Sequence, residues 1–264
     1  QLILLPVAVV FLVVLSLPNP SNIRRLACLG FVGCIVLMIL TLIFGAEIKG
    51  ARRWLSVAGF SLQASEFLKP CFAVVAAWMF AEWRRTPEFP GHWIAMGLYV
   101  LVVGLLLLQP DLGQAVIVSA VWFGQFFLAG LPIVLVIALI GLGVVGLVVA
   151  YFIFPHVSDR VDRFLNPASS DTYQVDRSLE AFANGGLVGT GPGEGKIKGV
   201  LPDAHADFVF AVAGEEFGAL VCLALIAVFC FLVLRGFLRL ISETDLFILI
   251  AAAGLLAQLG LQSF

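Results

Sequence analysis

The residues best suited to chemistry are ionisable groups in or beside long apolar segments. Asp207 follows His205 in Leu201-Pro-Asp-Ala-His-Ala-Asp-Phe208, and the next apolar segment begins there. Glu66 and Lys69 lie three residues apart at the start of another. Ionisable groups in such segments are costly and by default mark a functional site. A carboxylate such as Asp207 can accept a proton as a general base.

Basic residues near these acids predict an anionic ligand. Lys49, Arg52 and Arg53 share one short loop, and guanidinium groups can bind phosphate oxygens in a two-pronged fork. We expect Arg52 and Arg53, together with Lys69, to hold such a ligand. Ordinary solvated charge is the alternative for the loop.

The acids also have structural interpretations. Glu66 and Lys69 are spaced to pair on one helix face, so they could form a structural ion pair. Asp111 follows Pro110 and could merely cap a helix, or could hold a divalent cation such as Mg²⁺ or Mn²⁺. The adjacent Glu215 and Glu216 are expected to stabilise either helix packing or the floor of a cavity.

The surrounding elements are membrane helices. The chain is 61% hydrophobic and 12% charged, which excludes an ordinary soluble protein, and its net charge of −2 gives no indication of nucleic-acid binding. A membrane-spanning helix needs about 20 mostly apolar residues. We therefore predict an all-α, polytopic transmembrane bundle, with a single domain over 1–264. The eight predicted spans are residues 2–17, 26–46, 66–83, 92–108, 112–129, 131–155, 208–235 and 245–264.

Arginine bias predicts the orientation of the bundle. Alternate short loops carry three arginine pairs, and such loops favour the cytoplasmic side. This places the loop of Arg52 and Arg53, the corner at Asp111 and the large loop 156–208 on the extracytoplasmic side. The three pairs are Arg24 with Arg25, Arg84 with Arg85, and Arg235 with Arg239.

Two further features concern the chain ends and the large loop. Both ends fall inside apolar segments, so we expect the chain to be truncated, with at least one span missing at each side. The glycine-rich run 184–195 lacks the Gly-Lys-Ser/Thr ending and strand context of a nucleotide loop. Two alternatives remain for this run. Its backbone either lies against the membrane surface, where it could surround a phosphate, or serves as a flexible linker.

In this order and spacing, the motifs resemble the SEDS family (shape, elongation, division and sporulation), the peptidoglycan polymerases, and look more like its division members. The resemblance covers essentially the whole chain. Ala64 and Ala206 depart from the usual family residues without removing a reacting group. The motifs are Gly50-Ala-Arg-Arg-Trp54, Gln63-Ala-Ser-Glu-Phe-Leu-Lys69, Gln109-Pro-Asp-Leu-Gly113, Leu201-Pro-Asp-Ala-His-Ala-Asp-Phe-Val-Phe210 and Gly214-Glu-Glu-Phe-Gly218.

The resemblance implies ten spans in the full-length protein and a glycosyltransferase that polymerises lipid II during cell division. It implies that Asp207 is the catalytic residue. The expected substrate-binding residues are Arg52, Arg53, Lys69, Glu66, Asp111 and His205.

The implied partners are lipid II, the undecaprenyl-pyrophosphate-linked glycan, a class B penicillin-binding protein and other divisome membrane proteins. The implied location is the bacterial inner membrane at the division septum, with the active side in the periplasm. Two alternatives remain: a flippase that moves lipid II across the membrane, and a non-catalytic scaffold.

Overall fold

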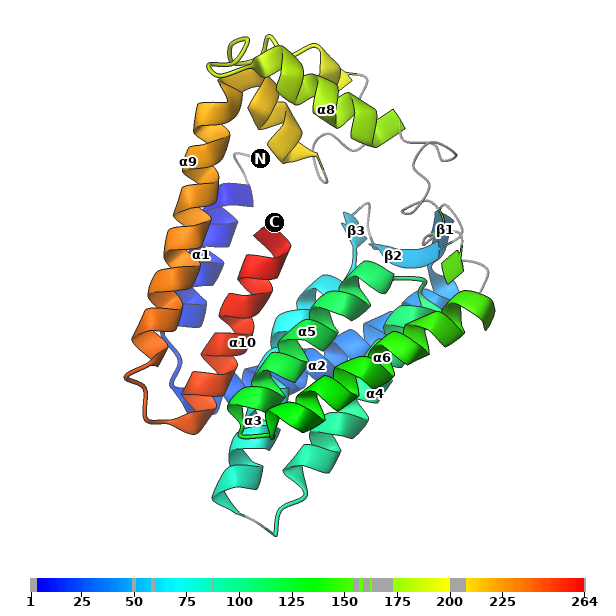
Figure 1. Cartoon of the computed structure of the whole chain (residues 1–264), viewed down its shortest axis with the longest axis vertical. Coiled ribbons are helices and arrows are strands. Elements are labelled where there is room, and N and C mark those ends of the chain that lie inside the picture. Colours follow the sequence, from blue (N-terminus) through cyan, green and yellow to red (C-terminus); the bar gives the residue numbers. More distant parts are fainter. Residues whose placement is uncertain are drawn as a thin grey trace. The chain divides into compact units, whose positions relative to one another are not determined.

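The chain is predominantly helical in a computed structural model, which describes residues 4–48, 51–57, 60–86, 88–153, 157–158, 162, 173–199 and 208–263 (Figure 1). The described helices of 13 residues or more are α1 (Leu4–Ser16), α2 (Pro20–Phe44), α3 (Ala64–Arg85), α4 (Gly91–Leu108), α5 (Leu112–Leu128), α6 (Ile133–Ile153), α8 (Tyr173–Gly185), α9 (Val209–Leu240) and α10 (Leu246–Ser263).

All eight predicted spans coincide with a helix, but the predicted number of spans is not confirmed. Among the described residues, six helices are long and apolar enough to cross a membrane: α2, α3, α4, α6, α9 and α10. Helix α5 has 17 residues and α1 has 13, fewer than the roughly 20 that a span requires. The prediction of a polytopic helical membrane protein is therefore confirmed.

The chain divides into two compact units, which are described separately. The first comprises residues 1–142 and 236–262, and the second comprises residues 143–235 and 263–264. The candidate site residues from Arg52 to Asp111 belong to the first unit. The large loop and most of α9 belong to the second.

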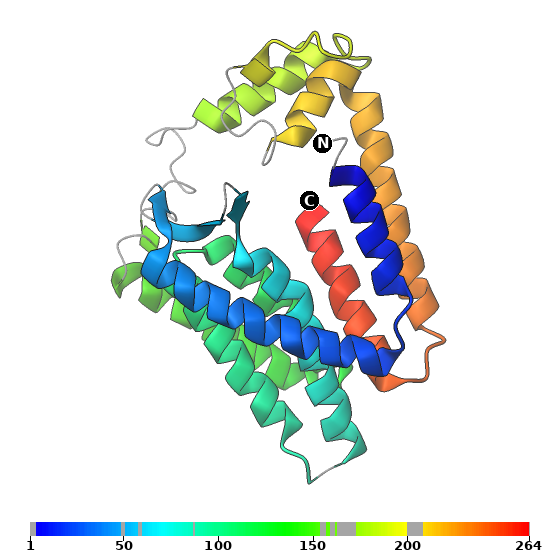
Figure 2. The same cartoon turned by 180° about the vertical axis from the view of Figure 1, so that it is seen from behind.

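Helix α3 is the centre of the first unit and packs against α2, α4 and α5. Figure 2 shows α2 in front of this group. Of the six candidate spans, α3 has the lowest mean hydropathy, 1.3, yet the largest buried share. Its neighbours bury Ser65 and Lys69 away from lipid, where unpaired polar groups are costly.

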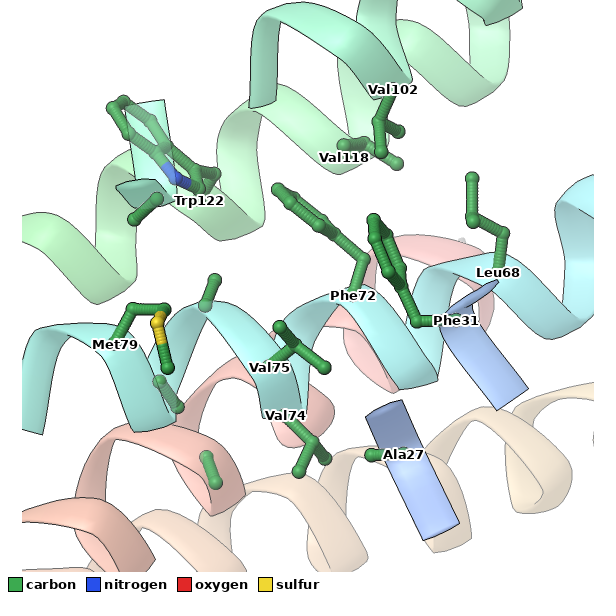
Figure 3. Close-up of a cluster of buried hydrophobic side chains, with 14 of the residues drawn as sticks. Ala27, Phe31, Leu68, Phe72, Val74, Val75, Met79, Val102, Val118 and Trp122 are labelled. Carbon is green, nitrogen blue, oxygen red and sulfur yellow. The ribbon is translucent and has the colours of Figure 1, made fainter. Parts of the chain in front are cut away.

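Aromatic and aliphatic side chains fill the space around α3. Phe31 of α2 stacks on Phe72 of α3 with ring centroids 6.0 Å apart (Figure 3). Further along α3, Phe80 stacks on Phe126 of α5 at 4.7 Å and lies beside the fully buried Trp122. These contacts fix α2, α3 and α5 against one another, so polar groups at the helix ends have defined positions.

A small antiparallel sheet follows α2 and was not predicted. Its strands have the order β1 (Ala46–Ile48), β2 (Ala51–Val57) and β3 (Phe60–Leu62), and Leu55 pairs with Leu62. The outer strands have three residues each, too few for a recognisable alternation of apolar and polar residues. The sheet connects α2 to α3 and carries Arg52 and Arg53.

Three of the six arginines predicted to be cytoplasmic, Arg24, Arg84 and Arg85, lie together at one end of the first unit. Arg85 pairs with Asp245, which precedes α10, at 3.2 Å. Arg24 lies over the ring of Phe247 at 4.3 Å, and Arg84 lies beside Gly130 in the α5–α6 turn. The loops that carry them therefore share one side, as the orientation argument requires.

In the second unit, α9 is broken at Gly218, whose backbone has φ 81° and ψ 173°. A break leaves backbone N–H and C=O groups without helical partners. The glycine-rich run supplies both kinds of partner. Gly186 and Leu187 accept from the amides of Ala219 and Leu220, while Thr190 and Gly191 donate to Glu215 and Glu216.

This packing does not fit the flexible-linker alternative for the glycine-rich run. A Cβ on Gly189 would lie 2.3 Å from the Glu216 carbonyl oxygen, so only glycine permits the approach. Glu215 is 1% exposed and accepts hydrogen bonds from the amides of Lys196 at 2.9 Å and Ile197 at 3.1 Å. The predicted packing role of Glu215 agrees with these contacts.

Candidate functional site

Arg53 is held by the corner between α4 and α5. Its Nε donates to the Gln109 carbonyl oxygen at 3.2 Å and its Nη2 donates to the Pro110 carbonyl oxygen. Its Nη1 lies 3.7 Å from Asp111 Oδ1. The last carbonyls of a helix lack helical donors and attract cations. Arg53 thus connects strand β2 to the end of α4.

Arg52 and Arg53 are neighbours on strand β2, where successive side chains point to opposite faces of the sheet. Arg52 is exposed, whereas Arg53 is partly buried against the α4–α5 corner. The two guanidiniums therefore have different surroundings, and their predicted contact with an anionic ligand stays a prediction. Arg52 is the more accessible of the two cations.

Asp111 is 5% exposed and is engaged by protein groups. Its Oδ1 faces Arg53, and its Oδ2 accepts from Gln63 Nε2 at 3.3 Å. It makes no side-chain capping hydrogen bond at the start of α5, so the capping alternative does not fit. The corner is further tied to α2 because Gln109 Nε2 donates to the Met38 carbonyl oxygen at 3.1 Å.

The described residues around Asp111 do not by themselves form a site for a divalent cation, and the predicted cation stays a prediction. Such an ion takes several oxygen ligands, mainly carboxylates. In the described part of the chain, no group of three or more His, Cys, Asp or Glu side chains could hold a metal ion. The neighbour of Asp111 is instead the guanidinium of Arg53, which would repel a cation.

Glu66 and Lys69 form the ion pair that their spacing predicted. Glu66 Oε2 lies 2.8 Å from Lys69 Nζ, and Glu66 Oε1 accepts from Gln114 Nε2 of α5 at 2.6 Å. The Lys69 side chain is 2% exposed and that of Glu66 is 44% exposed. Within the described residues Nζ has no acceptor in hydrogen-bond geometry, so the short contact to Glu66 is an ion pair.

The burial of Lys69 changes its expected role. Its side chain lines a void, too narrow for water, beside Phe72, Val121 and Gln258. An ammonium in that position is not open to a large phosphate. The exposed member of the pair is Glu66, and Lys69 is its buried counter-ion.

The remaining predicted site residues, Asp207 and His205, lie outside the described residues, as does Lys49. Their roles stay predictions. Of the seven predicted site residues, the structure brings Arg53 to Asp111 and Lys69 to Glu66, at the ends where α3 and α5 begin.

Three glutamines were not predicted as site residues: Gln63, Gln109 and Gln114. They contact Asp111, Met38 and Glu66 respectively. All three lie at a helix end, and two lie inside motifs that the sequence analysis singled out. Their position at the ends of apolar segments was the available signal, because polar groups there usually pair across helices.

The sequence of the chain matches one protein family and is similar to proteins of several bacteria. Residues 1–264 match the family of FtsW, RodA and SpoVE, described as "cell cycle protein". A Caulobacter vibrioides protein named "probable peptidoglycan glycosyltransferase FtsW" is 44% identical over 254 residues, which cover 96% of this chain and 65% of that protein. A Saccharophagus degradans protein of the same name is 36% identical over 83% of this chain and 59% of its own length. The chain therefore spans less than two thirds of these two relatives.

Two solved structures share the fold. A chain from a peptidoglycan synthase complex, described for its structural coordination of polymerization and crosslinking, has a TM-score of 0.76 at 25% identity, over 98% of this chain and 74% of that chain. The rod shape determining protein RodA of Thermus thermophilus has a TM-score of 0.67 at 26% identity, over 99% and 72%. Both likenesses extend over nearly all of the chain.

Proposed function

Since the chain belongs to the SEDS family of FtsW, RodA and SpoVE, we propose that the full-length protein is a peptidoglycan glycosyltransferase that polymerises lipid II during cell division. The observation that carries the proposal is a polar cluster in an otherwise apolar bundle, in a chain 44% identical to a relative with that name. A buried ammonium such as that of Lys69, paired with the half-exposed Glu66, is costly in a membrane and by default marks a functional site.

The proposed reaction is an inverting glycosyl transfer. The 4-hydroxyl oxygen of the lipid II GlcNAc forms a bond to the anomeric carbon of the growing glycan. The bond between that carbon and the lipid pyrophosphate breaks, and the pyrophosphate leaves with the electron pair. The hydroxyl proton passes to a base. Such chemistry needs a carboxylate at the hydroxyl and positive charge at the leaving group.

We assign the base to Asp207, two residues before α9 begins at Val209. The positive end of a helix favours an ionised carboxylate nearby. Among the described basic residues that were predicted to bind substrate, exposed Arg52 is the one we assign to the pyrophosphate. Arg53 and Lys69 support the site from within, and His205 is assigned to contact with the substrate.

The proposed partner is a class B penicillin-binding protein, a single-span transpeptidase that crosslinks the new glycan. The similar chain from a complex described for polymerization and crosslinking supports this proposal. The proposed site of action is the periplasmic face of the inner membrane at the division septum, with other divisome membrane proteins.

The test uses purified full-length protein in detergent with its transpeptidase and lipid II. We expect glycan polymer on a gel, and a loss of rate of at least about 100-fold for Asp207→Asn, since general-base catalysis typically contributes that much. If the wild-type protein makes no polymer, the proposal is wrong. Movement of labelled lipid II across vesicles without polymer would instead support the flippase, which the names of the relatives do not favour.

A further inference from the structure

Glu66 is held by two helices at once. Its Oε2 lies 2.8 Å from Lys69 Nζ, one turn further along α3, and its Oε1 accepts from Gln114 Nε2, in the first turn of α5, at 2.6 Å. The two oxygens of the carboxylate are therefore fixed from two directions. A free glutamate at a helix end would sample several rotamers, and fixing one of them costs entropy.

The exposure of the Lys69 and Glu66 side chains indicates which of the two charged groups a ligand can reach. Lys69 is 2% exposed and Glu66 is 44% exposed. The carboxylate thus stays accessible while its counter-ion is enclosed. An ionised carboxylate accepts hydrogen bonds only, so its ligand must present a donor such as a sugar hydroxyl or an amide N–H.

The side-chain amide of Gln114 is hydrogen-bonded through its nitrogen but, among the described residues, not through its oxygen. Nε2 donates to Glu66, whereas Oε1 is buried without a hydrogen-bond partner within the described residues. The carboxylate requires a donor, which fixes the orientation of the amide. A buried acceptor without a hydrogen bond, such as Gln114 Oε1, costs free energy. The interaction that Gln114 does make is the hydrogen bond from its Nε2 to Glu66.

We propose that Gln114 is a positioning residue, which holds the Glu66 carboxylate in one orientation toward a donor group of the sugar or peptide of the lipid-linked substrate. Lys69 neutralises the same carboxylate from the buried side. This inference rests on the proposed function, since it assigns a role within the same reaction.

The test compares Gln114→Leu with Ser119→Ala in the full-length protein with its transpeptidase, using lipid II. Leucine removes the donor without adding charge. Ser119 lies in the same helix and shares a hydrogen bond of 2.9 Å with Tyr99, so its alanine variant also loses one contact between helices, away from Glu66. The measurements are kcat, KM and Tm.

We expect Gln114→Leu to lower kcat at least about 10-fold, the effect of one hydrogen bond to a charged group. KM should stay within about 2-fold of wild type and Tm should match that of Ser119→Ala. In a Glu66→Asp background, the shorter side chain moves the carboxylate away from Gln114. In that background, adding Gln114→Leu should lower kcat by less than about 2-fold relative to Glu66→Asp alone.

The inference is overturned if Gln114→Leu retains the kcat of Ser119→Ala. It is also overturned if the loss of kcat is as large in the Glu66→Asp background, because Gln114 would then act independently of Glu66. An inactive wild-type protein would count against the proposed function itself, before any variant is compared.

Discussion

The guanidinium of Arg53 lies 3.7 Å from the carboxylate of Asp111, and this contact joins strand β2 to the corner between α4 and α5. The same guanidinium donates to the carbonyl oxygens of Gln109 and Pro110. The Arg53 side chain therefore binds both the carbonyl oxygens at the end of α4 and the carboxylate of Asp111, which precedes α5.

Arg53→Lys should destabilise this corner by about 1–3 kcal/mol. Lysine keeps the charge, but its compact ammonium cannot reach two carbonyls and a carboxylate with a planar fork. Thermal unfolding in detergent measures the effect as a fall in Tm. Arg52→Lys, at the exposed neighbouring position, is the control and should lower Tm less. Equal shifts for the two variants would contradict the anchoring role of Arg53.

Lys69→Met should reduce polymerisation more than stability. The substitution removes a buried ammonium that has no hydrogen-bond acceptor among the described residues and retains an apolar chain of similar size. Tm should therefore change little, because removing an incompletely paired buried charge relieves a cost.

The polymerisation rate of Lys69→Met should fall at least about 10-fold, since Glu66 loses the charge that neutralises it. Rates from gels of labelled glycan, set beside Tm, separate the two effects. A variant that unfolds readily yet polymerises normally per folded molecule would show that Lys69 is purely structural.

Glu215→Gln should loosen the glycine-rich turn. Both carboxylate oxygens of Glu215 accept from the Ile197 amide, and one also accepts from Lys196. Glutamine replaces one acceptor with a donor, so we expect a loss of about 1–3 kcal/mol. Hydrogen exchange at the Lys196 and Ile197 amides should become faster. Glu194→Gln, exposed in the same turn, should leave their exchange unchanged.

Gly218→Ala should disrupt the break in α9. The backbone at Gly218 has φ 81° and ψ 173°, a region that residues with a Cβ rarely adopt. Placing such a residue there costs about 1–3 kcal/mol of stability. The new Cβ would also lie 2.5 Å from the Leu187 carbonyl oxygen. We expect a lower Tm, whereas Gly141→Ala in α6, with nothing within 4 Å of its new Cβ, should not lower it. Similar Tm values for both variants would contradict the strain at the break.

Asp245 predicts a pH dependence of stability. Burial acts to raise its pKa, but hydrogen bonds from the amides of Ile248 and Phe247 and the charge of Arg85 outweigh this and lower the pKa below its usual 3.8. Because the folded pKa is below the unfolded one, the stabilisation is complete above about pH 4. It is lost as the pH falls through the folded value.

Asp245→Asn can still cap α10 but lacks the charge. The Tm difference between wild type and this variant should be constant near neutral pH and should shrink below about pH 4. Thermal unfolding across a pH series measures it. A difference that does not vary with pH would show that the charge contributes nothing.

The sequence alone predicted the helices. Apolar runs of about 20 residues can satisfy their backbone groups in lipid only by forming helices, so composition was sufficient. Arg24, Arg84 and Arg85 do lie near one end of the first unit, while the side of the membrane on which that end lies stays a prediction. The spacing of Glu66 and Lys69 predicted their pair for the same local reason.

The tertiary structure decided what each polar group contacts. Arg53 is 56 residues from Gln109, and Gln114 is 48 residues from Glu66. No helical periodicity relates positions so far apart. Only the packing of α3 against α4 and α5 determined that Lys69 is enclosed and Glu66 is accessible, because burial depends on neighbours that the chain supplies from elsewhere. The contact of Arg53 with the α4–α5 corner depends on tertiary packing in the same way.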